Sequence, residues 1–337
     1  MDGTQLSGRN IRVFLVDGSP HGLITAEIMN WTGHVLFAPR AKIPELLSRP
    51  EASRTGVYLL QGTADESDET LVYIGEGDDV GVRVAQHVKG KEFWDTACLI
   101  TSKDQNLTKA HVRFLESRLI SLTKQNGLAK LINATAPEGL YLPEAEMSDM
   151  HQFVQQLLVL LPVLGVTFLR SALGSDNDSF GDTLSLSGNQ PSWGPRASTL
   201  RQRPTLSKSE SPLFLMNGGA ARALEVDGQM VVLSGSQAKA MNQASLASNV
   251  RMHRQRLLEN GTLAPTGDPN VVKFVQDVAF SSPSAAAQAV MGTSRNGRSD
   301  WISETTGQTY AQWQQSEIEA SLKRNNLPHL DEGEKEL

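Results

Sequence analysis

The alternation of side chains in residues 56–60 and 71–75 predicts two neighbouring strands. Aliphatic side chains occupy every second position of both segments, which is the period of a strand with one buried face. A polar loop of about ten residues joins them, and a loop of that length allows antiparallel pairing. We therefore expect a β-hairpin in which Tyr58 and Tyr73 occupy comparable positions.

A helix is predicted after the hairpin, because Val80, Val84 and Val88 recur every four residues. Arg83 and His87 are also four residues apart, so they share an adjacent face of the same helix. A third apolar segment with the length of a strand follows. The order of these elements predicts a small sheet with helices packed on it.

A longer helix comes next, and its single apolar stripe is formed by Val112, Leu115, Leu119 and Leu122. Glu116 borders that stripe instead of facing water squarely. A carboxylate in such a place is more often functional or paired than an ordinary surface glutamate. An ion pair with a neighbouring arginine is the simple structural alternative.

These patterns predict an α+β protein whose core is a small mixed or antiparallel three-stranded sheet flanked by helices, followed by a second small α+β domain. The segment between them is rich in Ser, Gly, Asn, Asp and Pro, a composition typical of a flexible linker. The expected parts are a β-rich N-terminal element packed on the core (1–54), the core domain (55–170), the linker (171–211), the accessory domain (212–316) and a polar tail (317–337).

Charge is unevenly distributed along the chain. The net charge is −6, with 31 Lys and Arg against 37 Asp and Glu. Residues 62–82 hold seven acids and no base, whereas residues 83–130 hold nine bases and four acids. A local positive excess can bind phosphates even in an acidic protein. The candidates for nucleic-acid contact are Lys89, Lys91, Lys109 and Arg113, and a solvated mixed surface is the alternative.

One cysteine, Cys98, excludes an internal disulfide and a cysteine-rich zinc site. The first residues lack the basic start and apolar core of a signal peptide. The most apolar stretch, residues 153–169, is interrupted by Pro162 and Gly165, so we interpret it as a buried helix and not as a membrane span. The expected location is the cytoplasm.

The ordered set of Tyr58, Tyr73, Arg83, His87, Glu116 and Asn133 resembles the GIY-YIG nuclease superfamily. The tripeptides Gly56-Val57-Tyr58 and Tyr73-Ile74-Gly75 stand where that family has its two tripeptides. The resemblance covers roughly residues 55–135. Two departures are a valine in place of the usual isoleucine and a longer, acidic loop between the tripeptides, which could gate the approach of nucleic acid.

The resemblance implies a metal-dependent endonuclease that hydrolyses phosphodiester bonds of DNA. Glu116 would hold one Mg²⁺ or Mn²⁺, Arg83 would bind the phosphate, and Tyr58 would orient or deprotonate the attacking water. Tyr73 and His87 would share that task or bond the phosphate, and Asn133 would support the site. The alternative is a non-catalytic nucleic-acid-binding or regulatory protein on the same scaffold.

The second domain is similar to a small uncharacterised module often appended to bacterial GIY-YIG proteins. Residues 280–286 and 292–301 carry that likeness. Its arginines suggest target binding, with a scaffold role as the alternative; they are Arg251, Arg254, Arg256, Arg295 and Arg298.

Overall fold

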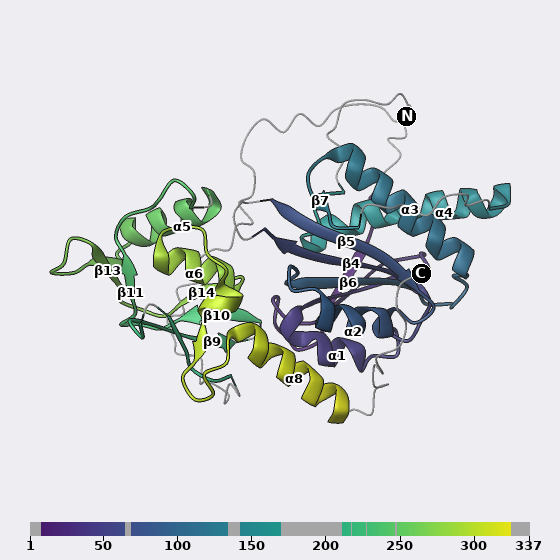
Figure 1. Cartoon of the computed structure of the whole chain (residues 1–337). Coiled ribbons are helices and arrows are strands. Elements are labelled where there is room, and N and C mark those ends of the chain that lie inside the picture. Colours follow the sequence, from purple (N-terminus) through teal and green to yellow (C-terminus); the bar gives the residue numbers. More distant parts are fainter. Residues whose placement is uncertain are drawn as a thin grey trace, which may run out of the picture.

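The computed structural model describes residues 8–64, 69–133, 142–169, 211–216, 218–226, 228–246 and 248–324. These residues form an α+β protein with sheets and helices in both halves of the chain (Figure 1). The linker expected at 171–211 falls outside the described residues apart from Ser211, and most of the acidic loop does so too.

The first half is built on a seven-stranded sheet with the order β1-β2-β3-β6-β4-β5-β7. All neighbouring strands are antiparallel except β5 and β7, which are parallel. The strands are β1 Ile11–Leu15, β2 Ile24–Ile28, β3 Gly33–Pro39, β4 Gly56–Thr63, β5 Thr70–Gly77, β6 Thr96–Ser102 and β7 Lys130–Leu131.

The sheet is larger than the three strands expected from the sequence. The three expected strands, β6, β4 and β5, are adjacent and lie near its middle. The strands of the β-rich N-terminal element expected at 1–54 belong to the same sheet as the core strands. The reason is that β3 pairs along its whole length with β6, from Gly33 opposite Ser102 to Pro39 opposite Thr96.

Helices cover both faces of this sheet, α3 and α4 on one face and α1 and α2 on the other (Figure 1). Alternate residues of β4 enter the two cores: Val57 and Leu59 pack with α3 and α4, and Tyr58 and Leu60 pack with α1 and α2. The helical segments are η1 Arg40–Lys42, α1 Ile43–Leu47, α2 Val80–Gly90, α3 Lys109–Asn126, α4 Glu144–Leu160 and η2 Leu161–Leu164.

The C-terminal domain contains a five-stranded sheet, β14-β10-β9-β8-β15, and a three-stranded sheet, β11-β13-β12. Its strands are β8 Phe214–Met216, β9 Ala221–Val226, β10 Gln229–Val232, β11 Gln237–Lys239, β12 Leu263–Pro265, β13 Val271–Phe274, β14 Val278–Phe280 and β15 Ile302–Ser303. Its helices are α5 Ser248–Glu259, α6 Pro283–Met291, α7 Gly297–Asp300 and α8 Tyr310–Arg324.

The two segments that carried the likeness of this domain contact each other. The Trp301 indole is fully buried and donates a 3.1 Å hydrogen bond to the carbonyl of Pro283. Gly297 lies so close to that carbonyl that an added Cβ would sit 2.0 Å from it. These residues therefore build the core of the domain.

The last described helix, α8, leaves the C-terminal domain and packs against α1 of the first domain (Figure 1). Ile318, 1% exposed, belongs to the same core as α1 and α2. The predicted start of the polar tail, residue 317, is therefore too early, because the helix continues to Arg324. No helix in the described ranges is both long and apolar enough to cross a membrane.

Candidate active site

The two motif tyrosines and His87 form one contact cluster. Tyr58 on β4 lies opposite Gly75 on β5, and its hydroxyl oxygen is 2.8 Å from Nε2 of His87. The ring of Tyr73 lies 4.6 Å from the His87 ring and 6.1 Å from the Tyr58 ring, measured between centroids. The hairpin and α2 thus bring together three residues that are distant in sequence.

The glycines of the two tripeptides allow this packing. A Cβ on Gly75 would lie 2.4 Å from Cζ and from the hydroxyl oxygen of Tyr58, so the ring needs the space that the missing side chain leaves. A Cβ on Gly56 would lie 2.3 Å from the carbonyl oxygen of Ile100 on β6. The first tripeptide therefore begins with glycine, and the second ends with glycine, because a side chain at either position would clash with its neighbour.

Burial sets the protonation of the cluster. The Tyr58 side chain is fully buried; this burial and the neighbouring Tyr73 raise the pKa of Tyr58, although the charge of Arg83 partly opposes them. Burial, followed by the charges of Lys91 and Arg83, lowers the pKa of His87 to about 4. At neutral pH both groups are uncharged, and His87 accepts a hydrogen bond from the Tyr58 hydroxyl when Nε2 is unprotonated.

Helix α2 presents Arg83 at the surface beside this cluster. The helix begins at an N-cap, Asp79, whose carboxylate accepts a 2.9 Å hydrogen bond from the amide of Val82. Arg83 is exposed and donates to Gln86 over 3.1 Å. A Cβ on Gly77 would lie 2.7 Å from Cγ of Arg83, so the arginine stem crosses the end of β5.

Glu116 approaches from α3, which packs on β5. It is half-buried beside the apolar stripe of that helix. Burial, and then the like charge of Glu76, raise the pKa of Glu116 to about 7, while the charges of Lys109, Arg83 and Arg113 act against that rise. The charge of Glu116 also contributes to the raised pKa of Tyr58, so the residues share one electrostatic neighbourhood.

Glu76 is the residue of this neighbourhood that the sequence did not reveal. It follows Gly75 on β5, and its carboxylate lies 2.7 Å from Nζ of Lys109 and 3.9 Å from Nε of Arg113. Its place directly after the second tripeptide was the only available signal, because the pairing with α3 is a contact between distant segments. Two predicted nucleic-acid contacts thus lie in ion pairs, although their side chains are 42% and 53% exposed.

The other two predicted contacts lie on or next to α2. Nζ of Lys91 stands 4.8 Å from the centroid of the Tyr73 ring, a cation–π arrangement at the edge of the cluster. Lys89 belongs to α2, and its side chain lies outside the described part of the structure. Lys91, Lys109 and Arg113 therefore border the site.

Asn133 extends the pairing of β5. Its Oδ1 accepts a 3.2 Å hydrogen bond from the amide of Ile74, and its Nδ2 donates a 2.5 Å bond to the carbonyl of the same residue. The side-chain amide thereby imitates a neighbouring strand next to Tyr73 and Gly75. Asn133 is a positioning residue in this arrangement.

Replacing Asn133 by Ala should leave both polar groups of Ile74 without their partner. We expect the free energy of unfolding to fall by about 1–3 kcal/mol. Any activity of the site should fall by more than the unfolded fraction of the protein explains. Chemical denaturation and the rate per folded molecule measure the two effects. An unchanged midpoint of unfolding would contradict this assignment.

Glu116 is the carboxylate of this neighbourhood that a divalent cation could use as a ligand. A cation beside Glu116 would relieve its repulsion from Glu76, which is the charge that helps to raise the Glu116 pKa. Among the described residues, no three His, Cys, Asp or Glu side chains gather into a complete ligand set. Mg²⁺ often takes one or two carboxylates and keeps water as its other ligands, so one protein ligand is sufficient.

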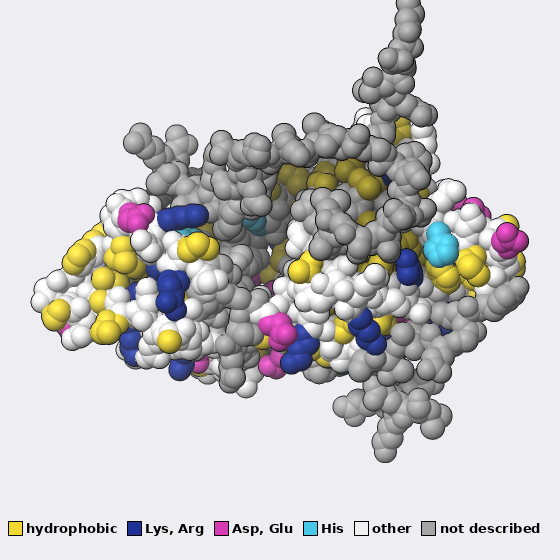
Figure 2. Space-filling view, turned by 90° about the horizontal axis from the view of Figure 1, so that it is seen from above, with side chains coloured by type: hydrophobic (Ala, Val, Ile, Leu, Met, Phe, Trp, Pro, Cys, Tyr) yellow, Lys and Arg dark blue, Asp and Glu magenta, His cyan; other side chains and the backbone are white. Residues whose placement is uncertain are grey.

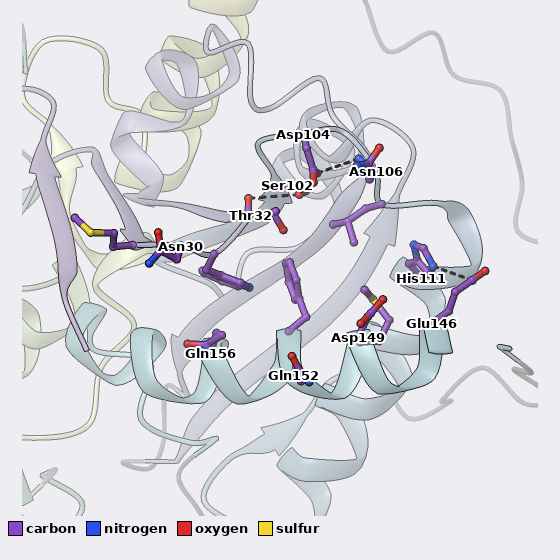
Figure 3. A pocket seen from close by; sticks show the side chains of 15 residues that line it. Asn30, Thr32, Ser102, Asp104, Asn106, His111, Glu146, Asp149, Gln152 and Gln156 are labelled. Atoms are coloured by element: carbon purple, nitrogen blue, oxygen red, sulfur yellow. Dashed lines mark hydrogen bonds and ion pairs between the residues drawn. The ribbon is translucent and has the colours of Figure 1, made fainter. Parts of the chain in front are cut away.

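The described structure also contains a pocket that is separate from this site. It has a volume of about 400 Å³ and lies between α4 and the loops that follow β2 and β6. Figure 3 shows His111 and Glu146 at one end, with Gln156 at the other. Nε2 of His111 lies 3.0 Å from the Glu146 carboxylate. None of the six motif residues lines it.

Of the five arginines suggested for target binding, Arg251, Arg256 and Arg295 are exposed and two are buried. Arg254 and Arg298 are buried, and Arg254 donates to the carbonyls of Ala289 and Lys239. Arg251 donates to backbone carbonyls, and Arg295 pairs with Asp300. On the face in Figure 2, the Lys and Arg side chains of this domain are scattered. These contacts favour a structural role.

Residues 214–314 match the family model described as a domain of unknown function, DUF4357. No GIY-YIG family model matches the first domain. No curated protein and no solved structure matches the chain. The chain therefore has a C-terminal segment similar to DUF4357, which agrees with the appended domain expected from the sequence.

Proposed function

We propose that this protein is a metal-dependent endonuclease of the GIY-YIG type that hydrolyses phosphodiester bonds of DNA. The observation that supports this best is the 2.8 Å contact between Tyr58 and His87. Both rings pack on Tyr73, and the charges of Arg83 and Glu116 influence the pKa of Tyr58. A proton acceptor, a fixed cation and a carboxylate are the groups that phosphodiester hydrolysis requires.

In the proposed reaction, Tyr58 orients a water molecule for attack on the phosphorus. The water oxygen bonds to phosphorus, and its proton moves to the Tyr58 hydroxyl as that hydroxyl passes its own proton to Nε2 of His87. The raised pKa of Tyr58 disfavours a free phenolate, and His87, with a pKa of about 4, holds the proton only transiently and releases it to solvent. The bond between phosphorus and the leaving sugar oxygen then breaks, and that oxygen takes a proton from solvent.

Arg83 stabilises the extra negative charge of the five-coordinate phosphorus through the two parallel donors of its guanidinium. A Mg²⁺ or Mn²⁺ ion held by Glu116 would supply further positive charge to the phosphate oxygens. Lys91, Lys109 and Arg113, which border the site, would contact neighbouring phosphates of the strand.

The proposal is tested by incubating the full-length protein with supercoiled plasmid and with single-stranded DNA. Cleavage is expected with Mg²⁺ or Mn²⁺ and should disappear with EDTA. Binding without cleavage of either substrate, in the presence of either metal, would favour the non-catalytic nucleic-acid-binding alternative.

The pKa of Glu116, about 7, predicts the pH dependence of cleavage. The carboxylate must be ionised to hold a cation, so the rate at subsaturating metal should rise between about pH 6 and pH 8. Replacing Glu76 by Gln removes a like charge, so the midpoint should move to lower pH. A midpoint that is the same in wild type and Glu76→Gln would contradict the proposed influence of Glu76.

A further inference from the structure

The C-terminal end of α2 is held by an arginine from outside the motif. The guanidinium of Arg40, on η1, donates to the carbonyls of Val88 over 2.8 Å, Lys91 over 2.9 Å and Trp94 over 3.3 Å. It also lies 4.2 Å from the centroid of the Trp94 ring. Arg40 is only 3% exposed. A cation at this position satisfies carbonyls that a helix end leaves without partners.

The C-terminal domain reaches the same arginine. Burial, and next the charge of Arg298, lower the pKa of Arg40 to about 9, and Tyr310 also influences it electrostatically. Next to Arg40 in the chain, the Pro39 ring lies so close to Gly228 that a Cβ there would be 2.8 Å from it. The turn between β9 and β10 thus contacts the segment that holds α2, and Arg298 of α7 and Tyr310 of α8 act on Arg40 electrostatically.

Arg298 and Tyr310, which act on Arg40 electrostatically, are themselves fixed by a buried chain of hydrogen bonds. Arg298 donates to Gln314 over 2.9 Å, Gln314 donates to the Tyr310 hydroxyl over 2.8 Å, and that hydroxyl donates to Glu225 over 2.5 Å. Two of these residues, Tyr310 and Gln314, lie on α8, the helix whose Ile318 is buried against the first domain. The docking of α8 and the position of Arg298 are therefore connected.

We propose that the docked C-terminal domain positions the His87 helix through Arg40, so that this domain is a structural part of the active site. Arg40 is a positioning residue: it donates hydrogen bonds to the end of α2, the helix that carries His87, while the turn between β9 and β10 of the C-terminal domain lies against Pro39 beside it. The inference rests on the proposed function only for its catalytic consequence, because the link between the two domains is a matter of packing.

Two substitutions in the full-length chain test the link from its two ends. Ile318→Ala loosens α8 from the core that it shares with α1, and Arg40→Gln removes the charge at the end of α2. Glu317→Ala, at an exposed neighbouring position of α8, is the matched control. Hydrogen exchange of the amides in residues 88–91 should be accelerated about tenfold or more by both substitutions and be unchanged in the control.

The NMR titration of His87, assigned by its loss in His87→Gln, separates positioning from general destabilisation. In both variants the His87 pKa should move from about 4 toward its ordinary value as the ring becomes solvated. The proposal would be overturned if Ile318→Ala left both the hydrogen exchange of residues 88–91 and the His87 titration unchanged. This holds even if Arg40→Gln failed to fold. If both readouts change but the wild type cleaves no DNA, the link stands and the proposed function fails.

Discussion

Replacing Arg83 by Ala should reduce the cleavage rate at saturating metal by about 10²–10³, the usual effect of removing one group that stabilises transition-state charge. Arg83 is exposed at the edge of the site, so the fold should be unaffected. Arg83→Lys should recover part of the rate, because lysine retains the charge but lacks the paired donors.

The assay should be run above about pH 8, since the charge of Arg83 lowers the pKa of Glu116 and its removal would otherwise protonate the carboxylate. Arg118→Ala on α3 is a suitable control, because Arg118 is also exposed but does not belong to the motif. Equal rates for Arg83→Ala and wild type would exclude Arg83 from phosphate binding.

Replacing Gly75 by Ala should disrupt the site from within. The new Cβ would stand 2.4 Å from the Tyr58 ring carbon Cζ and hydroxyl oxygen, so the ring must move and the 2.8 Å contact with His87 must open. We expect a destabilisation of about 1–3 kcal/mol, as for other overpacked cores, and loss of cleavage in the molecules that remain folded.

Gly267→Ala is the matched control, since a Cβ at Gly267 would meet nothing within 4 Å. Thermal unfolding measures the stability of both variants, and cleavage is measured well below their melting temperatures. A Gly75→Ala protein with wild-type stability and wild-type cleavage would show that the close packing of Tyr58 on β5 is unimportant.

The individual elements around the site could be predicted from local patterns. The alternation in residues 56–60 and 71–75 corresponds to β4 and β5, and the four-residue spacing of Val80, Val84 and Val88 corresponds to α2. Both patterns arise from one buried face and need no knowledge of distant partners. The half-buried position of Glu116 followed from its place beside the stripe of α3 in the same way.

Contacts between distant segments could not be predicted. The seven-stranded sheet depends on the pairing of β3 with β6. The apolar pattern of β6 would suit other strands of the chain equally well, so the sequence does not identify β3 as its partner. The ion pair of Glu76 with Lys109 is likewise invisible to spacing along one element. The apolar face of α8 was assigned in part to a polar tail because its buried partner, α1, is remote in sequence.

The most direct test of the proposed nuclease is plasmid cleavage by wild type and Glu116→Gln with Mn²⁺ at about pH 8. The raised pKa of Glu116 means that folding favours the neutral acid, so stability falls as pH rises from the ordinary value through about 7. Glu116→Gln should therefore be at least as thermostable as wild type at this pH, and loss of cleavage cannot then reflect unfolding.

Glu304→Gln, an exposed substitution in the C-terminal domain, controls for a nonspecific effect of replacing a glutamate by glutamine. We predict metal-dependent cleavage by wild type and Glu304→Gln, and none by Glu116→Gln. Cleavage by Glu116→Gln at the wild-type rate would contradict the assignment of this site as the one that cuts DNA.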